Sequence, residues 1–206
     1  MVKLYQFVIT GMPRSGTTFV ADLLTQAGVA CNHELYYGMP ASSVMRENAV
    51  AEASWMALPH LDRDKALHGY KVIHLLRNPL RVVSSLVQMG LLEDDQFETN
   101  PYTIYVDKTV PLRHLSGLDR YLHFCMYWNL QVERRADGHF QLEWASEHPA
   151  EFLKAFGVEA PEGLDTSPKN VWGSVNRLTL ADLDGCALKD AFIEFSRSCG
   201  YDLTEQ

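Results

Sequence analysis

The hydrophobic pattern alternates between short apolar runs and longer segments in which apolar residues recur every three or four positions. The short runs at 5–10, 29–32, 71–76 and 139–144 are typical of buried strands, with a further extended segment at 53–58. Helical spacing occurs at 17–27, 41–51, 79–89, 121–135, 148–156 and 188–199. Because strands and helices alternate, we expect an α/β three-layer sandwich, with a central parallel sheet and helices on both faces.

One segment, residues 90–118, departs from this alternation. It has no clear hydrophobic period, carries a group of acidic side chains and contains prolines at 101 and 111. Long ordered loops are often functional. We therefore interpret this segment as a surface excursion or lid on a single domain that spans residues 1–206.

The composition is that of an ordinary globular protein, with 47% hydrophobic and 21% charged residues in a chain of 206. That length suits one domain with a full hydrophobic core. No run approaches the ~18–20 apolar residues of a membrane span, and the N-terminus has no signal-peptide pattern, so we expect a cytoplasmic protein without membrane contact. The formal charge of −8 argues against a nucleic-acid surface.

The cysteines are scattered along the chain, with no C-x-x-C pair. They are Cys31, Cys125, Cys186 and Cys199. This spacing favours reduced, mostly buried thiols over a zinc site or a disulfide framework. No metal site is therefore predicted.

The most informative motif is the segment 11–18, Gly-Met-Pro-Arg-Ser-Gly-Thr-Thr, which joins the first predicted strand to the first predicted helix. A glycine-containing turn before a helix can bind phosphate, because free backbone N–H groups and the positive end of the helix dipole face the anion. The spacing almost matches the P-loop pattern G-x-x-x-x-G-K-[ST], so the fold is expected to be P-loop NTPase-like. However, Thr17 stands where the lysine should be, and the cation of the loop is Arg14.

This loop can hold a phosphate but lacks the lysine that ATP- and GTP-using enzymes place on the β- and γ-phosphates. The strand that ends at Arg77 also lacks the terminal aspartate that such enzymes use near Mg²⁺. Both features argue against a P-loop nucleotide or small-molecule kinase, which is kept as an alternative.

A second motif lies in residues 70–86, Tyr-Lys-Val-Ile-His-Leu-Leu-Arg-Asn-Pro-Leu-Arg-Val-Val-Ser-Ser-Leu. Its apolar start predicts a central strand, and Pro79 suits the first turn of the helix that follows. Arg77 then lies at the carboxyl end of the strand, where open α/β sheets bind ligands. Arg81 and Ser85 are four residues apart on the predicted helix and share a face.

Together the two motifs resemble those of sulfotransferases that use 3′-phosphoadenosine 5′-phosphosulfate (PAPS). In that family the loop holds the 5′-phosphosulfate, and a strand-end Arg with a helix Ser eight residues later holds the 3′-phosphate; here these are Arg77 and Ser85. A later loop, Lys169–Arg177, resembles one that folds over the nucleotide. The resemblance implies cofactor contacts from Arg14, Ser15, Gly16, Thr17, Thr18, Phe19, Arg77, Ser85 and Arg177, with Phe19 either against the adenine or in the core.

The resemblance also implies an activity: transfer of a sulfuryl group from PAPS to a hydroxyl or amine of a small-molecule or carbohydrate acceptor. PAP would be the product, and no metal would be required. Arg14 is then expected to be catalytic, because it would stabilise charge on the leaving phosphate. Since many family members carry a lysine in the loop that is absent here, a catalytically weak PAPS- or PAP-binding protein is a second alternative. The acceptor's identity and the oligomeric state stay open.

Two residues are candidates for the general base. Glu34 lies twenty residues after Arg14, just past the second predicted strand, where carbohydrate-type sulfotransferases carry a catalytic glutamate. His60 lies upstream of the strand that ends at Arg77, as does a histidine of cytosolic small-molecule sulfotransferases, although the gap is shorter here. His33 is adjacent to Glu34 and is expected to point elsewhere.

Overall fold

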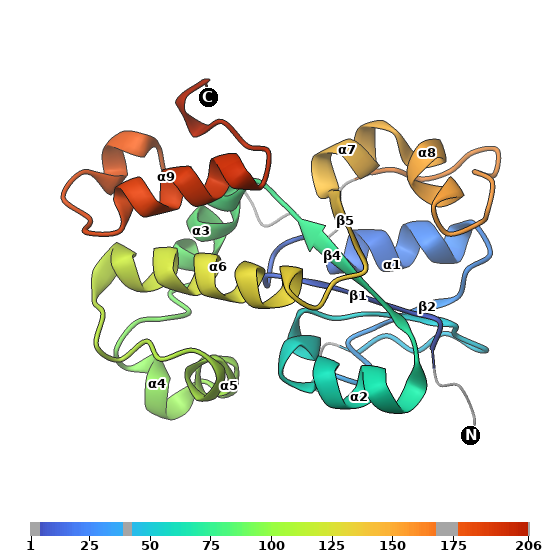
Figure 1. Cartoon of the computed structure of the whole chain (residues 1–206), viewed down its shortest axis with the longest axis horizontal. Coiled ribbons are helices and arrows are strands. Elements are labelled where there is room, and N and C mark those ends of the chain that lie inside the picture. Colours follow the sequence, from blue (N-terminus) through green and yellow to red (C-terminus); the bar gives the residue numbers. More distant parts are fainter. Residues whose placement is uncertain (1–4, 39–42, 168–176, 206) are drawn as a thin grey trace. The chain divides into compact units, whose positions relative to one another are not determined.

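The computed structural model describes residues 5–38, 43–167 and 177–205. The chain forms two compact units, one from residues 1–77 and 131–171 and the other from residues 78–130 and 172–206. The first unit contains the sheet, and the second is helical (Figure 1).

A five-stranded parallel sheet forms the centre of the first unit. In spatial order its strands are β2 (Cys31–His33), β3 (Ala51–Ala53), β1 (Phe7–Gly11), β4 (Lys71–Leu76) and β5 (Gly138–Gln141). Each neighbouring pair is parallel. The predicted α/β fold with a central parallel sheet is therefore confirmed.

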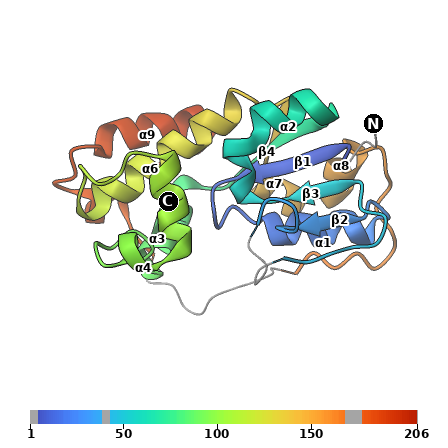
Figure 2. The same cartoon turned by 90° about the horizontal axis from the view of Figure 1, so that it is seen from below.

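Helices cover both faces of this sheet (Figure 2). On one face lie α1 (Thr17–Gln26), α7 (Leu142–Glu147) and α8 (Pro149–Lys154), and on the other lie the 3-10 helix η1 (Trp55–His60) and α2 (Leu61–His68). The core on the α1 face joins Leu24 of α1 and Phe152 of α8 to Ile9 and Leu75 of the central strands. Strands buried on both faces read as continuous apolar runs, which is why β1 and β4 could be predicted.

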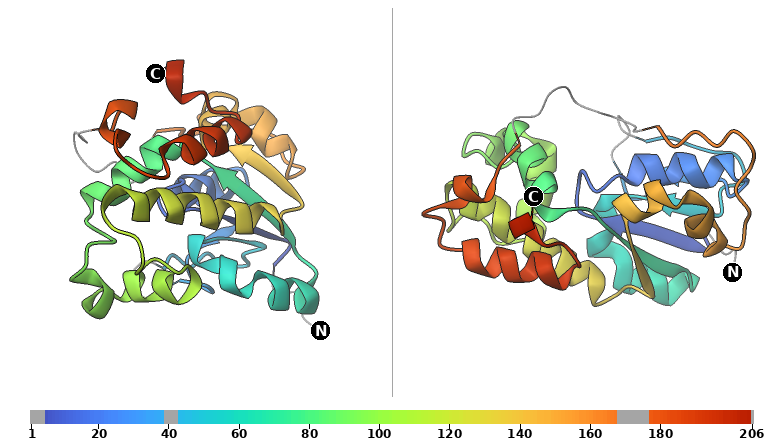
Figure 3. Two further views of the ribbon diagram at one scale, coloured as in Figure 1. Left: turned by 60° about the vertical axis from the view of Figure 1, so that its left-hand side comes forward. Right: turned by 90° about the horizontal axis from the view of Figure 1, so that it is seen from above.

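The second unit is built from helices, seen from two sides in Figure 3. They are α3 (Pro79–Gln88), α4 (Gln96–Thr99), α5 (Pro101–Thr109), most of α6 (Gly117–Glu133), η2 (Leu180–Leu183), α9 (Lys189–Ser198) and η3 (Leu203–Glu205). Trp128 of α6 is fully buried and contacts Phe124 edge-on, with ring centroids 5.4 Å apart. Across the three described ranges, no helix combines the length and apolar character needed to cross a membrane.

The start of α3 follows the sequence prediction. Pro79 is the first helical residue, and the Asn78 side chain accepts a hydrogen bond from the Arg81 backbone N–H at 3.1 Å. Asparagine at this position satisfies one of the N–H groups that lack a partner at a helix start. This local chemistry fixes where β4 ends and α3 begins.

Other element predictions were wrong. The expected helix at 41–51 is not helical in its described part, because the Val44 backbone pairs with His33 and residues 51–53 join the sheet as β3. The extended segment at 53–58 is mostly η1, and α2 was not predicted at all. The expected strand at 139–144 gives way to α7 after Gln141. These elements are short, so the hydrophobic pattern of each covers only a few residues. Tertiary contacts, rather than that pattern, determine whether such a segment forms a strand or a helix.

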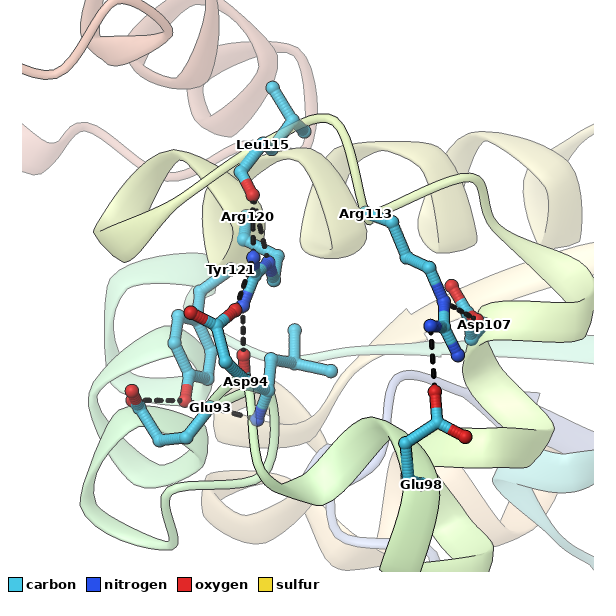
Figure 4. A network of polar contacts seen from close by, with 9 residues as sticks. Glu93, Asp94, Glu98, Asp107, Arg113, Leu115, Arg120 and Tyr121 are labelled. Carbon is cyan, nitrogen blue, oxygen red and sulfur yellow. Dashed lines mark hydrogen bonds and ion pairs between the residues drawn. The ribbon is translucent and has the colours of Figure 1, made fainter.

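The acidic segment interpreted as an excursion or lid contains α4 and α5 and is tied to α6 (Figure 4). The Arg120 guanidinium donates to the carbonyls of Leu92 and Leu115, both at 2.6 Å. The Tyr121 hydroxyl accepts from the Leu92 N–H at 3.1 Å and donates to Glu93 at 3.0 Å. Two side chains of α6 thus hold a segment whose sequence has no clear helical period.

Candidate functional site

The loop between β1 and α1 has the shape that the sequence predicted. It leaves the sheet at Gly11, turns through a hydrogen bond from the Ser15 N–H to the Met12 carbonyl at 3.0 Å, and enters α1 at Thr17. Gly16 caps the helix with a φ of 98°, a left-handed conformation that glycine adopts without strain.

Both loop glycines are required by close approaches. A Cβ atom at Gly11 would lie 2.2 Å from the carbonyl oxygen of Leu75 on the neighbouring strand. A Cβ atom at Gly16 would lie 2.7 Å from the side chain of Leu142, at the start of α7. The backbone of the loop therefore packs closely against the carboxyl end of β4 and against the start of α7, and these contacts restrict its conformation.

The loop presents polar groups suited to an anion. Gly16 has no side chain, so among the described residues α1 begins without a side-chain cap from its N-cap residue. The Ser15 side chain is 1% exposed, and its hydroxyl has no hydrogen-bond partner among the described residues. Buried hydroxyls are nearly always hydrogen-bonded. A phosphate or sulfate oxygen would satisfy both the hydroxyl and the helix N-terminus, so these residues fit a phosphosulfate group.

Two arginines meet at this loop. Arg77, at the end of β4, donates from Nη1 to the backbone carbonyl of Arg14 at 2.8 Å. Arg14 itself has a φ of 72°, which is uncommon for a residue other than glycine. Burial lowers the pKa of the Arg14 guanidinium, an effect that a bound anion would oppose. The structure thus joins the Arg77 side chain to the backbone of the loop that carries Arg14, two residues that belong to separate motifs in the sequence.

His33 lies at the loop, contrary to our expectation that it would point elsewhere. Its Nε2 atom is 3.2 Å from the Thr17 hydroxyl and 3.1 Å from the Thr18 hydroxyl. The same atom is 3.9 Å from Oε1 of Glu34. The cause is strand alternation, since Cys31 and His33 share the face of β2 that is packed against α1. That alternation was the signal in the sequence that could have identified His33.

Glu34 follows β2 directly and is 5% exposed. Its N–H continues the sheet pairing by donating to the Ala53 carbonyl at 3.1 Å. Its φ of 50° turns the chain sharply, and a Cβ atom at Gly38 would lie 2.1 Å from the Glu34 carbonyl oxygen. A tight turn therefore places this carboxylate beside His33 and, through it, next to the threonines of the loop.

His60 lies at the end of η1, where its ring stacks on Tyr37 with centroids 5.7 Å apart. Burial lowers the pKa of His60, while Asp64 raises it and Arg63 lowers it. The ring contact of His60 among the described residues is thus with Tyr37. The choice of His60 as the base stays a prediction.

Phe19 is buried on α1 and belongs to the core cluster that includes Leu24 and Phe152. The sequence allowed it to lie in the core or against an adenine, and the structure gives it a core contact. Its contact with adenine stays a prediction.

Ser85 and Arg177 belong to the second unit. Ser85 is half-buried on α3, and Arg177 is exposed. The neighbouring Ser84 donates to the Leu80 carbonyl at 2.7 Å and accepts from the Leu178 N–H at 3.0 Å. The chain next to Arg177 is therefore fastened to α3 one residue before Ser85. The preceding part of that loop, residues 169–176, lies outside the described residues.

No disulfide joins the four cysteines in the described ranges; Cys31 and Cys125 are buried, and Cys186 and Cys199 are half-buried. Burial raises the pKa of both buried thiols. No cluster of three or more His, Cys, Asp or Glu side chains that could hold a metal ion occurs in the part of the chain that the structure describes.

No protein-family model matches the sequence, and no curated protein matches it. Among solved structures, a sulfotransferase from Alicyclobacillus acidocaldarius is similar over 99% of this chain and 99% of its own, with 18% sequence identity and a TM-score of 0.56. At that identity the likeness establishes the fold. The α/β fold of this chain is therefore one that a sulfotransferase also adopts.

Proposed function

We propose that this protein transfers a sulfuryl group from PAPS to a hydroxyl or amine of a small-molecule or carbohydrate acceptor. The observation that carries the proposal is the loop between β1 and α1. It combines a helix N-terminus without a side-chain cap, a buried Ser15 hydroxyl that has no hydrogen-bond partner among the described residues, and the hydrogen bond from Arg77 to the Arg14 carbonyl. The likeness to a sulfotransferase structure supports it at the level of the fold.

The residues of the loop have distinct roles in this proposal. Backbone N–H groups and the hydroxyls of Ser15, Thr17 and Thr18 hold the 5′-phosphosulfate, and Gly16 lets the anion approach the helix. Arg14 stabilises the charge that grows on the leaving phosphate. PAPS, when bound, supplies the activated sulfuryl group. Arg77 of the first unit is assigned to the 3′-phosphate, and Ser85 and Arg177 keep the cofactor-binding roles that the resemblance to the sulfotransferase motifs implies.

The acceptor must lose a proton, and two residues can take it. Glu34 is favoured because its carboxylate lies 3.9 Å from His33 Nε2, which itself contacts both threonine hydroxyls of the loop. A base in that position is next to the group that reacts. His60, stacked on Tyr37, is the alternative base.

A second candidate function is PAPS or PAP binding with little turnover. It is favoured by one feature, Thr17 in the position where many sulfotransferases have lysine. In that case the loop would bind the nucleotide without strong assistance to the leaving group. A P-loop kinase is the third possibility, opposed by the same missing lysine.

Calorimetric titration distinguishes these functions. We expect PAP to bind without Mg²⁺, and Ser15→Ala to weaken that binding, because the hydroxyl would otherwise contact the anion. Ser146→Ala, an exposed serine of α7 in the same unit, is the matched control and should bind PAP normally. Binding of ATP·Mg²⁺ alone would overturn the proposal in favour of a kinase.

Turnover decides between the first two candidates. Consumption of PAPS is measured with a panel of phenols, aliphatic alcohols, sugars and amines. Formation of a sulfated product supports the transferase. PAP binding with no product from any acceptor class supports the binding protein.

A further inference from the structure

Glu52 is a buried carboxyl group that the proposed reaction does not use. It is the middle residue of β3, 0% exposed, between Val8 of β1 and Asn32 of β2 in the sheet register. Burial raises the pKa of Glu52 to about 7. A carboxyl group kept in the centre of a sheet at this cost is expected to make specific hydrogen bonds.

The hydrogen bonds of Glu52 go to the turn that follows Glu34. Oε1 of Glu52 accepts from the Tyr36 backbone N–H at 3.0 Å. Burial is the largest influence on the pKa of the Glu52 carboxyl and raises it. The backbone N–H groups of Tyr36, Tyr37 and Leu35 act in the opposite direction and lower it. A negative carboxylate thus faces the N–H groups of consecutive turn residues, an arrangement that holds a turn more strongly than a neutral acceptor does.

The remaining polar groups around Glu52 come from the two neighbouring strands and the turn. The Tyr5 hydroxyl, just before β1, accepts from the Asn32 amide at 3.0 Å and lowers the pKa of Glu52 through its own hydrogen bond. Burial raises the pKa of Tyr5 and of the Cys31 thiol, and the Glu52 charge raises both further. Oε2 of Glu52 has no hydrogen-bond partner among the described residues, so it is the atom on which a proton can reside.

The turn needs such an anchor. Glu34 has a φ of 50°, a left-handed conformation that is strained for residues other than glycine and persists only where the surroundings hold it. Strand pairing fixes the N–H of Glu34, and Glu52 fixes the N–H of Tyr36 two residues later. Two hydrogen bonds therefore fix the backbone around the candidate base, one to the Ala53 carbonyl and one to Glu52. Of these two acceptors, only the Glu52 carboxyl can change its charge.

We propose that Glu52 is a positioning residue: its buried carboxylate orders the turn that carries Glu34, and protonation of Glu52 loosens that turn. The inference rests on the proposed function only in giving Glu34 a role in the reaction. As the pH falls through the neutral range, the charged hydrogen bonds to the turn become neutral ones and weaken. Above that range the turn is held in the conformation that places Glu34 beside His33.

Amide hydrogen exchange followed by NMR tests this inference without an activity assay. The protection of the Tyr36 amide, corrected for intrinsic exchange, should rise about fivefold between pH 6 and pH 8, since hydrogen bonds to charged acceptors are stronger by about 1 kcal/mol. In Glu52→Gln this rise should disappear. Glu151→Gln, which changes an exposed carboxylate of α8, should keep it.

A second variant keeps the test decisive if Glu52→Gln does not fold. Tyr5→Phe removes a hydrogen bond that lowers the pKa of Glu52, so the pH at which protection changes should move upward. A wild-type profile that is flat between pH 6 and pH 8 would overturn the inference. So would an unchanged profile in Tyr5→Phe or in a folded Glu52→Gln protein.

Activity measurements separate the failure of this inference from that of the proposed function. In the wild type, kcat should fall below neutral pH while the affinity for PAP stays constant, and Glu52→Gln should lose this inflection. If the protection profile behaves as expected but no acceptor is sulfated, the turn is ordered by Glu52 and the proposed function fails. If acceptors are sulfated but protection is flat, the inference alone fails.

Discussion

At the scale of single residues, Arg14 is the side chain on which the proposed chemistry depends most. It is half-buried, has a left-handed backbone and offers its carbonyl to Arg77. A strained conformation held by its surroundings is common where a loop binds a ligand. Because the loop has no lysine, Arg14 is the cation within it that can meet charge on the leaving phosphate.

Arg14→Ala should therefore lower turnover by ~10²–10³, the span typical of losing one group that stabilises developing charge. The affinity for PAP should change much less, because the helix N-terminus and the hydroxyls still hold the anion. Steady-state kinetics and calorimetry measure the two effects. Arg134→Ala, at an exposed arginine of the same unit, is the control. Equal losses of binding and turnover would show that Arg14 acts only in binding.

The two candidate bases are distinguished by a pair of variants. Glu34→Gln keeps the size of the side chain but removes the proton acceptor, so turnover should fall by ~10²–10⁴ with PAP affinity nearly intact. His60→Asn should cost less, because the contact found for His60 is with Tyr37. An active Glu34→Gln enzyme beside an inactive His60→Asn enzyme would reverse the assignment.

At the scale of elements, the segment before α6 depends on one buried arginine. The Arg120 side chain is 8% exposed and reaches the carbonyls of Leu92 and Leu115, whereas the Arg113 side chain is 56% exposed and pairs with acidic side chains at the surface. Both lie over the Phe97 ring, at 4.9 Å for Arg120 and 5.3 Å for Arg113. The two arginines therefore form a matched pair that differs in burial.

Arg120→Met should destabilise this unit by about 1.5–3 kcal/mol, the range for hydrogen bonds that involve a charged group. Arg113→Met should have little effect, because exposed ion pairs contribute little to stability. Limited proteolysis between residues 90 and 116 and urea unfolding measure the difference. Equal sensitivity of the two variants would mean that burial of Arg120 does not anchor the segment.

At the scale of the whole molecule, one buried carboxyl sets a pH dependence of stability. The pKa of Glu52 is about 7 in the fold and 4.5 in its ordinary state. Between these values the folded protein binds more protons at this site than the unfolded chain does. The free energy of unfolding should therefore decrease as the pH rises through this window, by at most about 1.4 kcal/mol for each pH unit.

Urea unfolding at pH 5.5 and pH 8 tests this sign. The wild type should lose stability as the pH rises, because its buried Glu52 becomes charged. Glu52→Gln has no such charge, so its free energy of unfolding relative to the wild type should increase with pH. Glu151→Gln serves as the control, since its exposed carboxylate should follow the wild type. If the free energy of unfolding changed equally in the wild type and in Glu52→Gln between pH 5.5 and pH 8, Glu52 would not be the source of the pH dependence.

The amino-acid pattern was enough to predict the features that depend on local chemistry. The apolar runs of β1 and β4, the glycine-containing loop at 11–18 and the proline that starts α3 were all found, because strand burial and turn geometry act over a few residues. They were sufficient to predict the fold class, whereas the roles of the candidate site residues stay predictions.

Features that depend on contacts between distant segments became visible in the folded protein. β3 is three residues long and exists because β1 and β2 pair with it. His33 meets Thr17 and Thr18 because β2 is packed against α1, and the pKa of Glu52 is raised because β3 lies inside the sheet. Pairing, packing and desolvation of this kind involve residues that are far apart in the chain; strand alternation indicates which face His33 shares with Cys31, but a local pattern does not specify which segment packs on that face.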